Sequence, residues 1–451
     1  MPQKPLYSLT AFWLIVVLYV LLFMNGKEWL KQDALRHDMT SYYAYLPAVF
    51  IEDDITLNSD SARKNMYYWW SVESPQRPGR IIRMSMGVSY LHLPFFLMAH
   101  ATAKPLGHAT DGANAHYFFF IILGSMFYGL AGLWLLRKLL LMYHSDKVTA
   151  ITLVLIAAGT NLLYYTLSEG PMSHVYNFFL IICLLYLTIK WHQKPAIGNT
   201  VLLGLVMGTI TLARPLNVLL ALLPVLYNVH SKDSLLQKLQ LVKTRWYLVL
   251  LVCACAFLAL LPQLLYWKYM SGKWMFYTYG EEGFFFTKSQ VLNGLFSYRK
   301  GWWLYTPVMA LATAGLFVIK KYSKEWALGL WVMLPIFVWC VYSWWSWWYG
   351  GSFGSRPMID IYGAMALPLA SLFTWALQRK WTGATFLVLG AFFVYLNGFQ
   401  TWQYKKSLIH WDSMSKAVYW KVFLSKKWPD DYGDLLKHPD YEKAIKGQKE
   451  Y

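Results

Sequence analysis

Charged residues are scarce in this 451-residue chain: they make up 14% of it, against about 25% in ordinary globular proteins. Hydrophobic residues make up 57% of the chain and aromatic residues 18%. A soluble fold of this length has too little interior to cover so large an apolar fraction. The composition therefore excludes a disordered chain and an ordinary soluble enzyme. It predicts an all-α integral membrane protein with many spans.

Cysteine is also rare, and several common motifs are missing. Cys183, Cys253, Cys255 and Cys340 all lie inside apolar runs without a CxxC pair, which is typical of small buried residues and not of a disulfide or zinc framework. No GxxxxGK[ST] phosphate loop occurs, which argues against an ATP-driven pump. No HExxH pair occurs either, which excludes a zincin protease. No metal site is predicted, because the histidines lack ligand spacing.

What the chain does have is a set of apolar stretches long enough to cross a bilayer. Eleven spans are predicted, at residues 6–24, 116–136, 148–166, 172–189, 197–213, 215–229, 247–267, 303–319, 326–343, 360–377 and 383–399. The first is interpreted as a retained span, because no small-residue cleavage site follows it. Residues 1–399 are thus expected to form one transmembrane domain, followed by a tail at 400–451.

The net charge of +18 indicates orientation in the membrane and no nucleic-acid partner. Fourteen Lys and Arg against three Asp and Glu lie in the loops 137–147, 190–196, 230–245, 320–325 and 378–381. These loops, and with them the N-terminus, are predicted to be cytoplasmic. The loops 25–115 and 268–302 and the tail are then on the outer face. Segment 87–103 contains His92, Pro94 and His100, and it is interpreted as an interfacial or re-entrant helix, because one more crossing would invert every later loop.

The outer face collects the unusual residues. Met39 to Ile51 are predicted to form an amphipathic helix on the membrane, with Tyr42 and Tyr43 among its aromatic residues. Asp38 stands at its start, either as a helix cap or as a carboxylate that acts as a general base. Arg214 and Arg356 each precede a proline at a helix start, where a bound phosphate is favoured. Snorkelling arginines are the alternative.

Other polar and aromatic residues on this face are candidates for a substrate pocket. Glu169 precedes a Gly-Pro helix start, Glu281 and Glu282 lie in the loop 268–302, and a tryptophan-rich run leads into a glycine-rich segment. The predicted pocket residues are Tyr42, Tyr43, Glu169, His174, Glu281, Glu282, Trp348 and Asp360. Arg80 and Arg83 are the next candidates for a phosphate site.

Five stretches of the chain carry a family resemblance. They are HDMTSYYAYLPAVF, EGPMSHVYNF, LARPLN, GEEGFFFTKSQVLNGLFSYRKGWWLYTP and WWYGGSFGSRPMIDIY, spread over residues 37–362. Together they resemble the GT-C class of membrane glycosyltransferases, and more narrowly the relatives in glycosyltransferase family 39: the protein O-mannosyltransferases and the bacterial lipid A sugar transferases. Each stretch is short, but their order and common sidedness strengthen the resemblance.

The resemblance implies a GT-C-type helical bundle with outer-face juxtamembrane helices in the plasma (inner) membrane. It implies transfer of a sugar from a polyprenyl-phosphate donor to a lipid, glycan or protein acceptor, with inversion and with Asp38 as the catalytic carboxylate. Many enzymes of this class have a second acid at this position. Here the neighbour is His37, so no cofactor is expected and a divalent cation stays an open alternative.

Two other functions remain as alternatives. One is a transporter or flippase for a lipid-linked or small solute, which usually places ionisable residues at mid-membrane and often shows repeated halves. The predicted spans are nearly free of mid-span charge. The other is a non-catalytic membrane scaffold, which would have no need of Asp38 or of the two Arg-Pro starts.

Overall fold

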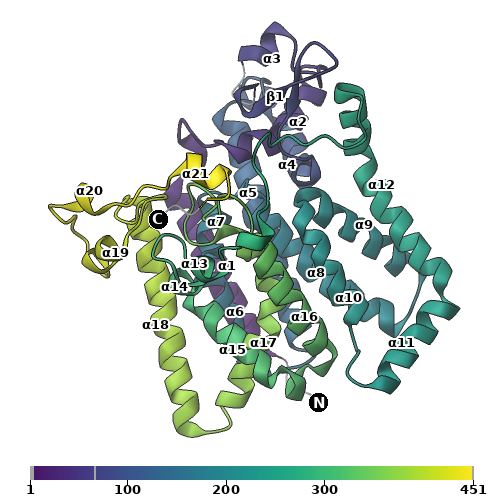
Figure 1. Cartoon of the computed structure of the whole chain (residues 1–451), viewed down its shortest axis with the longest axis vertical. Coiled ribbons are helices and arrows are strands. Elements are labelled where there is room, and N and C mark those ends of the chain that lie inside the picture. Colours follow the sequence, from purple (N-terminus) through teal and green to yellow (C-terminus); the bar gives the residue numbers. More distant parts are fainter. Residues whose placement is uncertain (1–4, 65–67, 449–451) are drawn as a thin grey trace.

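The chain forms a bundle of long helices with an irregular cap at one end (Figure 1). The computed structural model describes residues 5–64 and 68–448, so the last three residues of the predicted tail lie outside it. The described chain is 70% helical. The long helices are α1 (Leu6–Gly26), α5 (Ala115–Leu140), α6 (Asp146–Ala158), α8 (Ser173–Gln193), α9 (Ile197–Ala213), α12 (Trp246–Ser271), α15 (Pro307–Tyr322), α16 (Lys324–Val341), α17 (Tyr362–Ala376) and α18 (Lys380–Lys405).

Seven helical segments of the described chain are long and apolar enough to cross a membrane. They are Leu6–Leu30, Ala115–Leu140, Ser173–Gln193, Trp246–Ser271, Lys324–Val341, Arg356–Ala376 and Lys380–Lys405. The other four predicted spans coincide with shorter or interrupted helices. One of them divides into α6 and α7 (Leu162–Leu167), and the break lies where the Asn161 amide donates to the Phe353 carbonyl, 3.0 Å away. The all-α character is confirmed, and the seven apolar helices are consistent with a membrane protein, whereas the count of eleven spans stays a prediction.

The buried centre of the bundle is α17, and the peripheral helices are α12 and α18. In the most apolar window of Arg356–Ala376, 89% of the residues are buried, against 22% in the corresponding windows of α12 and α18. Close approach is possible because Gly315 of α15 faces the Pro368 backbone of α17 and leaves no room for a Cβ atom. α12 packs along α9 in the same way, through Gly204 and Gly208.

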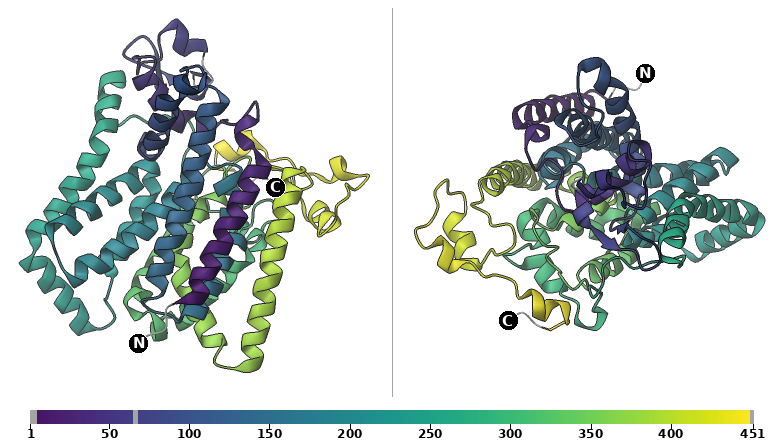
Figure 2. Two further views of the ribbon diagram at one scale, coloured as in Figure 1. Left: turned by 180° about the vertical axis from the view of Figure 1, so that it is seen from behind. Right: turned by 90° about the horizontal axis from the view of Figure 1, so that it is seen from above.

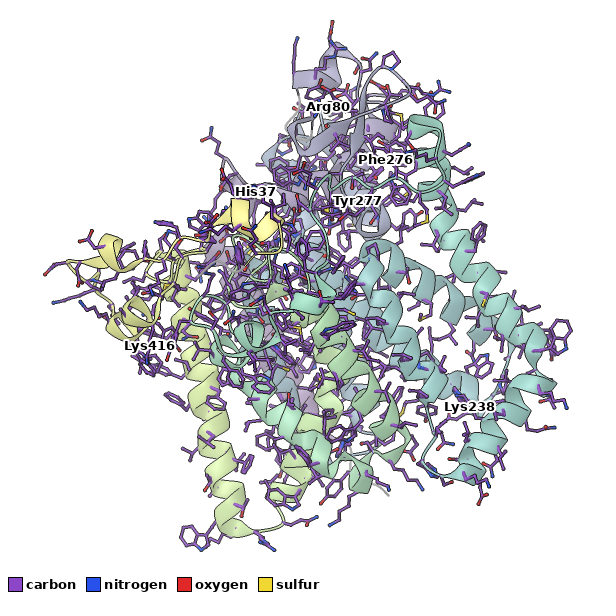
Figure 3. The ribbon with its side chains drawn as sticks, viewed as in Figure 1. His37, Arg80, Lys238, Phe276, Tyr277 and Lys416 are labelled. Atoms are coloured by element: carbon purple, nitrogen blue, oxygen red, sulfur yellow. The ribbon has the colours of Figure 1, made fainter. Side chains whose placement is uncertain are left out.

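The predicted basic loops gather at one end of the bundle. The His144 ring lies 2.9 Å from the Thr374 hydroxyl and 3.2 Å from that of Ser323, which joins two of these loops to the last turn of α17. Lys238, on α11 (Lys232–Thr244), donates to the Pro224 carbonyl at the end of η4 (Pro215–Ala221) and α10 (Leu222–Leu226). In Figure 3, Lys238 lies at the opposite end of the molecule from His37 and Arg80.

The other end, called here the Asp38 end, carries the remaining elements. They are η1 (Glu28–Leu30), α2 (Asp38–Phe50), α3 (Asp60–Lys64), η2 (Tyr68–Trp70), β1 (Ser71–Glu73), β2 (Arg80–Ile82), α4 (Gly87–Ala103), η3 (Lys104–Leu106), η5 (Phe286–Lys288), α13 (Val291–Phe296), α14 (Trp302–Tyr305) and η6 (Arg356–Ile361). β1 and β2 form an antiparallel hairpin in which Val72 pairs with Ile81.

Helix α4 begins and ends at the Asp38 end. Its first residue, Gly87, contacts the backbone of Ala213, immediately before Arg214. Near its last turn, the Ala99 carbonyl lies 3.0 Å from the ring of His116, at the start of α5. This arrangement agrees with the prediction that segment 87–103 does not cross the bundle.

Helix α2 differs from its predicted placement against lipid, and that prediction is wrong. Every residue from Met39 to Ala48 is buried. The rest of the first loop folds over the helix: the Tyr43 hydroxyl donates to the Gly112 carbonyl at 2.7 Å, and the Tyr45 hydroxyl to that of Met84 at 2.8 Å. The aromatic face of α2 therefore packs against protein and not against lipid. Its buried phenol groups have the hydrogen-bond partners that such groups need.

The C-terminal tail continues from α18 at the Asp38 end. Lys405, at the end of α18, forms a 3.0 Å ion pair with Glu28, just after α1. The tail contains α19 (Lys416–Val422), α20 (Tyr432–Leu435) and α21 (Tyr441–Ile445). It extends sideways beyond α18 in the views of Figure 2. The predicted tail is thus on the same side as Asp38.

Candidate functional site

The centre of the candidate site is an ion pair between Asp38 and Arg356. The Arg356 Nη2 atom lies 3.2 Å from Asp38 Oδ2, and both side chains are about four-fifths buried, with 17% and 18% exposure. Asp38 is the first residue of α2 and Arg356 the first residue of η6. Two residues predicted separately, one as a base and one as a phosphate ligand, therefore contact each other.

Asp38 does not act as a helix cap. His37 occupies the cap position with φ +51°, and no side chain caps α2. The Thr40 hydroxyl instead donates to the His37 carbonyl at 2.7 Å. A left-handed backbone is unfavourable for a residue other than glycine, and here it turns the chain so that the Asp38 carboxylate points to Arg356. The cap alternative is wrong.

A second buried cluster surrounds the carboxylate of Asp360. Its side chain is fully buried, and Oδ1 lies 3.0 Å from His174 Nδ1. Oδ2 accepts hydrogen bonds from the Asn217 amide at 2.8 Å and from the Asn177 amide at 3.3 Å. Oδ2 also lies 3.5 Å from Arg214 Nη1. Because its oxygens are occupied and hidden, Asp360 holds other side chains and does not line an open pocket.

The Asp360 cluster fixes the orientation of Arg214. Its Nη1 atom lies 3.1 Å from His174 Nδ1, and its guanidinium group lies over the Tyr349 ring, 5.9 Å from the centroid. Tyr349 has φ +56° and is followed by Gly350 with φ +60°, so the tryptophan-rich loop bends sharply at this contact. Arg214 is thereby held between helix α8 and the loop that precedes Arg356.

Tyr42 connects the two clusters. It lies one helical turn after Asp38 on α2, so the two side chains share a face. Its hydroxyl interacts with Ser173 and with the charges of Asp38, Arg214 and Arg356. Burial, with a smaller contribution from the Asp38 carboxylate, raises the pKa of Tyr42 to about 12. The phenol therefore stays neutral and can donate a hydrogen bond within the site.

Glu169 lies on the other flank of this centre. Its Oε1 atom is 3.1 Å from Arg36 Nη2 and accepts a hydrogen bond from the Tyr164 hydroxyl at 3.2 Å. Arg36 also pairs with Asp33 at 2.6 Å. Because Arg36 is two residues before Asp38, these contacts anchor the start of α2 against the bundle.

Glu282 joins the loop 268–302 to the first loop. It forms an ion pair with Arg83 and accepts a 3.0 Å hydrogen bond from the Trp345 indole. The Arg83 guanidinium lies 5.1 Å from the centroid of the Tyr279 ring, and Tyr279 interacts electrostatically with Tyr42 and Asp38. Glu282 and Arg83 thus lie beside the centre, across Tyr279.

Three predicted pocket residues do not join this centre. Tyr43 points away from Tyr42 into the core under α4, where it contacts Phe96. Trp348 is 1% exposed and packs against Arg299 and Tyr441. Glu281 is exposed beside Glu282. Their chemical types suited a pocket, but the fold turns each side chain elsewhere.

Sequence reasoning missed Asn177, Asn217, Arg36, Tyr349 and Lys300. Asn217 had a signal, because it ends the LARPLN stretch three residues after Arg214. Lys300 lies in the resembling stretch that begins at Gly280, but nothing in that stretch predicts its burial: it is 2% exposed and donates to the carbonyls of Ser352 and Trp411. Burial lowers the pKa of Lys300 to about 7. This amine ties the tail to the glycine-rich segment that precedes Arg356.

The described residues contain no group of three or more His, Cys, Asp or Glu side chains arranged to hold a metal ion. Beside Asp38, the His37 ring contacts Trp70 in an edge-on arrangement, 5.5 Å between centroids. The groups that surround Asp38 are cationic or phenolic. This donor set suits an anionic ligand.

Comparisons with known proteins leave the family open. No protein-family model matches this sequence, and a search of curated proteins finds no significant match.

Proposed function

We propose that this protein is a membrane glycosyltransferase that moves a hexosyl or pentosyl group from a polyprenyl-phosphate donor to an acceptor hydroxyl. The observation that carries the proposal is the 3.2 Å contact between Asp38 and Arg356. It joins a carboxylate suited to accept a proton and a guanidinium suited to bind phosphate. Transfer of a sugar from a lipid-phosphate donor, whose phosphate is the leaving group, needs both side by side.

The reaction is a single displacement. An acceptor hydroxyl oxygen attacks the anomeric carbon and forms the new glycosidic bond, while the bond from that carbon to the phosphate oxygen breaks. The electron pair of the broken bond stays on the polyprenyl phosphate, and the hydroxyl proton goes to Asp38. One displacement inverts the configuration at the anomeric carbon.

Arg356 and Arg214 stabilise the charge that grows on the leaving phosphate. Both belong to helix starts with a following proline, where free backbone N–H groups add to the positive potential. Because these positive groups are in place before the reaction, the protein needs little reorganisation as the charge develops. Asp360 and His174 support this role by holding Arg214, and the neutral Tyr42 phenol is placed to hydrogen-bond the sugar or phosphate.

The membrane supplies the donor, so the site must be reached from a bilayer surface. The seven apolar helices and the gathering of site residues at one end suit a lipid-linked substrate. In the proposed orientation the Asp38 end faces the outer side of the plasma (inner) membrane and the N-terminus is cytoplasmic. That orientation follows from the positive charge of the loops at the other end.

The experiment uses purified protein in lipid with a panel of polyprenyl-phosphate sugars and candidate acceptors. Release of polyprenyl phosphate is followed for the wild type and for Asp38→Asn. We expect turnover of at least one donor, with the variant slower by about 100-fold or more. Glu281, the exposed carboxylate beside Glu282, serves as the control, and Glu281→Gln should retain wild-type turnover.

Two outcomes would contradict the proposal. If folded Asp38→Asn turned over the donor at the wild-type rate, Asp38 would not be the general base. Uptake of intact lipid-linked sugar across the vesicle membrane, without bond cleavage by the folded wild type, would establish the transporter alternative.

A further inference from the structure

A groove separate from the Asp38–Arg356 centre runs between α13 and the start of α19. Its volume is about 510 Å³. One wall comes from the loop 268–302 and carries Leu292 and Phe296, which are 74% and 56% exposed. The other wall comes from the tail and carries Met414, Lys416 and Lys437. The groove thus has an apolar side and a cationic side.

The groove lies where a predicted span leaves the membrane. α19 packs on the residues that lead into α15: the Tyr419 ring lies 5.2 Å from Tyr298 and 5.7 Å from Tyr305, between centroids. The Trp420 indole donates to the Tyr298 hydroxyl at 3.2 Å and is 53% exposed. An exposed Trp among Tyr residues at the end of a predicted span is typical of the interfacial region of a bilayer.

The view of the side chains agrees with this depth. In Figure 3, Lys416 lies on the flank of the bundle beside α18, and lower than His37 at the Asp38 end. The tail extends sideways at this level in Figure 2. The cationic side of the groove is therefore beside the bundle, where lipid head groups would lie, and not on its top.

The charge of this part of the tail is of one sign. Residues 415–428 contain Lys416, Lys421, Lys426 and Lys427 and no acidic residue. Lys421 is paired with Asp431 at 2.5 Å. Lys416 and Lys437 are exposed, and no ion pair within residues 5–64 and 68–448 involves either of them. The two amines on the groove are free to meet an anion.

The backbone that carries these lysines is already fixed. The Lys437 amide donates to the Ser413 carbonyl at 2.9 Å. The Lys437 carbonyl accepts a hydrogen bond from Arg299 at 3.1 Å. The Ser415 hydroxyl caps α19 at the Val418 amide, 3.2 Å away. A site whose walls are held before binding loses little entropy when a ligand enters.

We propose that this groove binds an anionic phospholipid of the surrounding membrane. The phosphate lies between the ammonium groups of Lys416 and Lys437, and the first part of an acyl chain lies along Leu292 and Phe296. An anionic head group complements the two unpaired amines. The exposed apolar side chains explain why the occupant is a lipid and not a soluble anion.

The test measures lipid binding alone, without sugar donor or acceptor, so its result is independent of the proposed transferase activity. The delipidated full-length protein is titrated in detergent with phosphatidylglycerol or with phosphatidylcholine of the same acyl chains, and native mass spectrometry gives the bound fraction. The variant Lys416→Gln/Lys437→Gln removes the groove cations. Lys426→Gln/Lys427→Gln removes the same charge from exposed positions that do not line the groove.

We expect wild type to bind phosphatidylglycerol at least tenfold more tightly than phosphatidylcholine. The groove variant should lose that preference, and the control variant should keep it. All four lysines are exposed, so both variants should fold, which size-exclusion chromatography checks. Equal binding of the two lipids by wild type, or an equal loss in the two double variants, would overturn the proposal. Phe296→Ala should weaken binding of both lipids. Unchanged binding would show that the apolar wall is not part of the site.

Discussion

The side chains of Asp38 and Arg356 meet across 318 residues of sequence, with Arg356 Nη2 donating to Asp38 Oδ2 at 3.2 Å. In the proposed reaction these groups have different partners, because Asp38 takes the acceptor proton and Arg356 holds the donor phosphate. A phosphate that engages Arg356 competes with Asp38 for the same guanidinium. Donor binding is therefore expected to free the carboxylate for its role as base.

The first prediction concerns Arg356. Arg356→Gln should lower kcat/KM for the donor by about 100-fold or more, because a phosphate-stabilising cation is lost. Arg356→Lys should recover only part of this, since lysine keeps the charge but lacks the planar fork that binds two oxygens. Steady-state kinetics with varied donor would measure both effects.

The control for Arg356 is Arg77→Gln. Arg77 is an exposed arginine of the first loop that donates to the Tyr269 carbonyl at 2.8 Å, and its loss should leave kcat/KM unchanged. If Arg356→Gln were as active as Arg77→Gln, the phosphate would be bound elsewhere, and Arg83 would be the next residue to test.

The second prediction concerns the support of Arg214. Asp360→Asn should lower the free energy of unfolding by about 3 kcal/mol, because it leaves a buried guanidinium without its counter-charge. It should also raise the KM for the donor, since Arg214 loses the carboxylate that orients it. Thermal unfolding in detergent and donor titration measure the two effects separately. Instability with an unchanged KM would show that Asp360 is structural and has no influence on the donor.

The third prediction is a pH dependence from Lys300. Burial lowers its pKa to about 7, against about 10.4 for an unfolded lysine. Between these values the unfolded chain binds a proton that the folded chain does not. As pH falls from about 10.4 to about 7, this residue therefore removes roughly 1 kcal/mol of stability per pH unit.

The measurement compares unfolding of wild type and Lys300→Met at pH 7.5, 8.5 and 9.5. The variant loses two hydrogen bonds, so its overall stability can differ, and the readout is the difference in slope. Lys426→Met changes an exposed lysine and should have the wild-type slope. Identical slopes for wild type and Lys300→Met would show that the Lys300 amine titrates normally.

The fourth prediction concerns the two ends of the bundle. Lys273→Cys, Lys426→Cys and Lys321→Cys each place a thiol at an exposed position. An impermeant maleimide is added to cells whose outer envelope is opened and whose plasma membrane is intact. It should label the first two positions and not the third, and the parent protein without the added cysteine gives the background. Labelling of residue 321 from outside would invert the proposed orientation. Opposite labelling of residues 273 and 426 would contradict the placement of the tail.

Several features of the fold could be predicted from the sequence because they depend on local composition. Apolar length alone located the first residue of α1, α5, α8, α9 and α12 to within one residue and their last residue to within four, since a helix that crosses lipid must be apolar throughout. Charge counting assigned the loops to two ends, and it also indicated that α4 does not cross. The Arg-Pro starts at Arg214 and Arg356 were found because proline marks the first turn of a helix.

The sequence by itself thus determined the apolar, helical character of the chain, the two groups of loops and the chemical types available at the Asp38 end. Only the tertiary structure decided which of them meet. It buried α2 under the first loop, turned Tyr43 and Trp348 away, paired Asp38 with Arg356 and surrounded Asp360 with four donors. The physical reason is that apolar length and charge sidedness are local properties of a segment. A contact between side chains hundreds of residues apart depends instead on how the helices pack, and no local pattern encodes that.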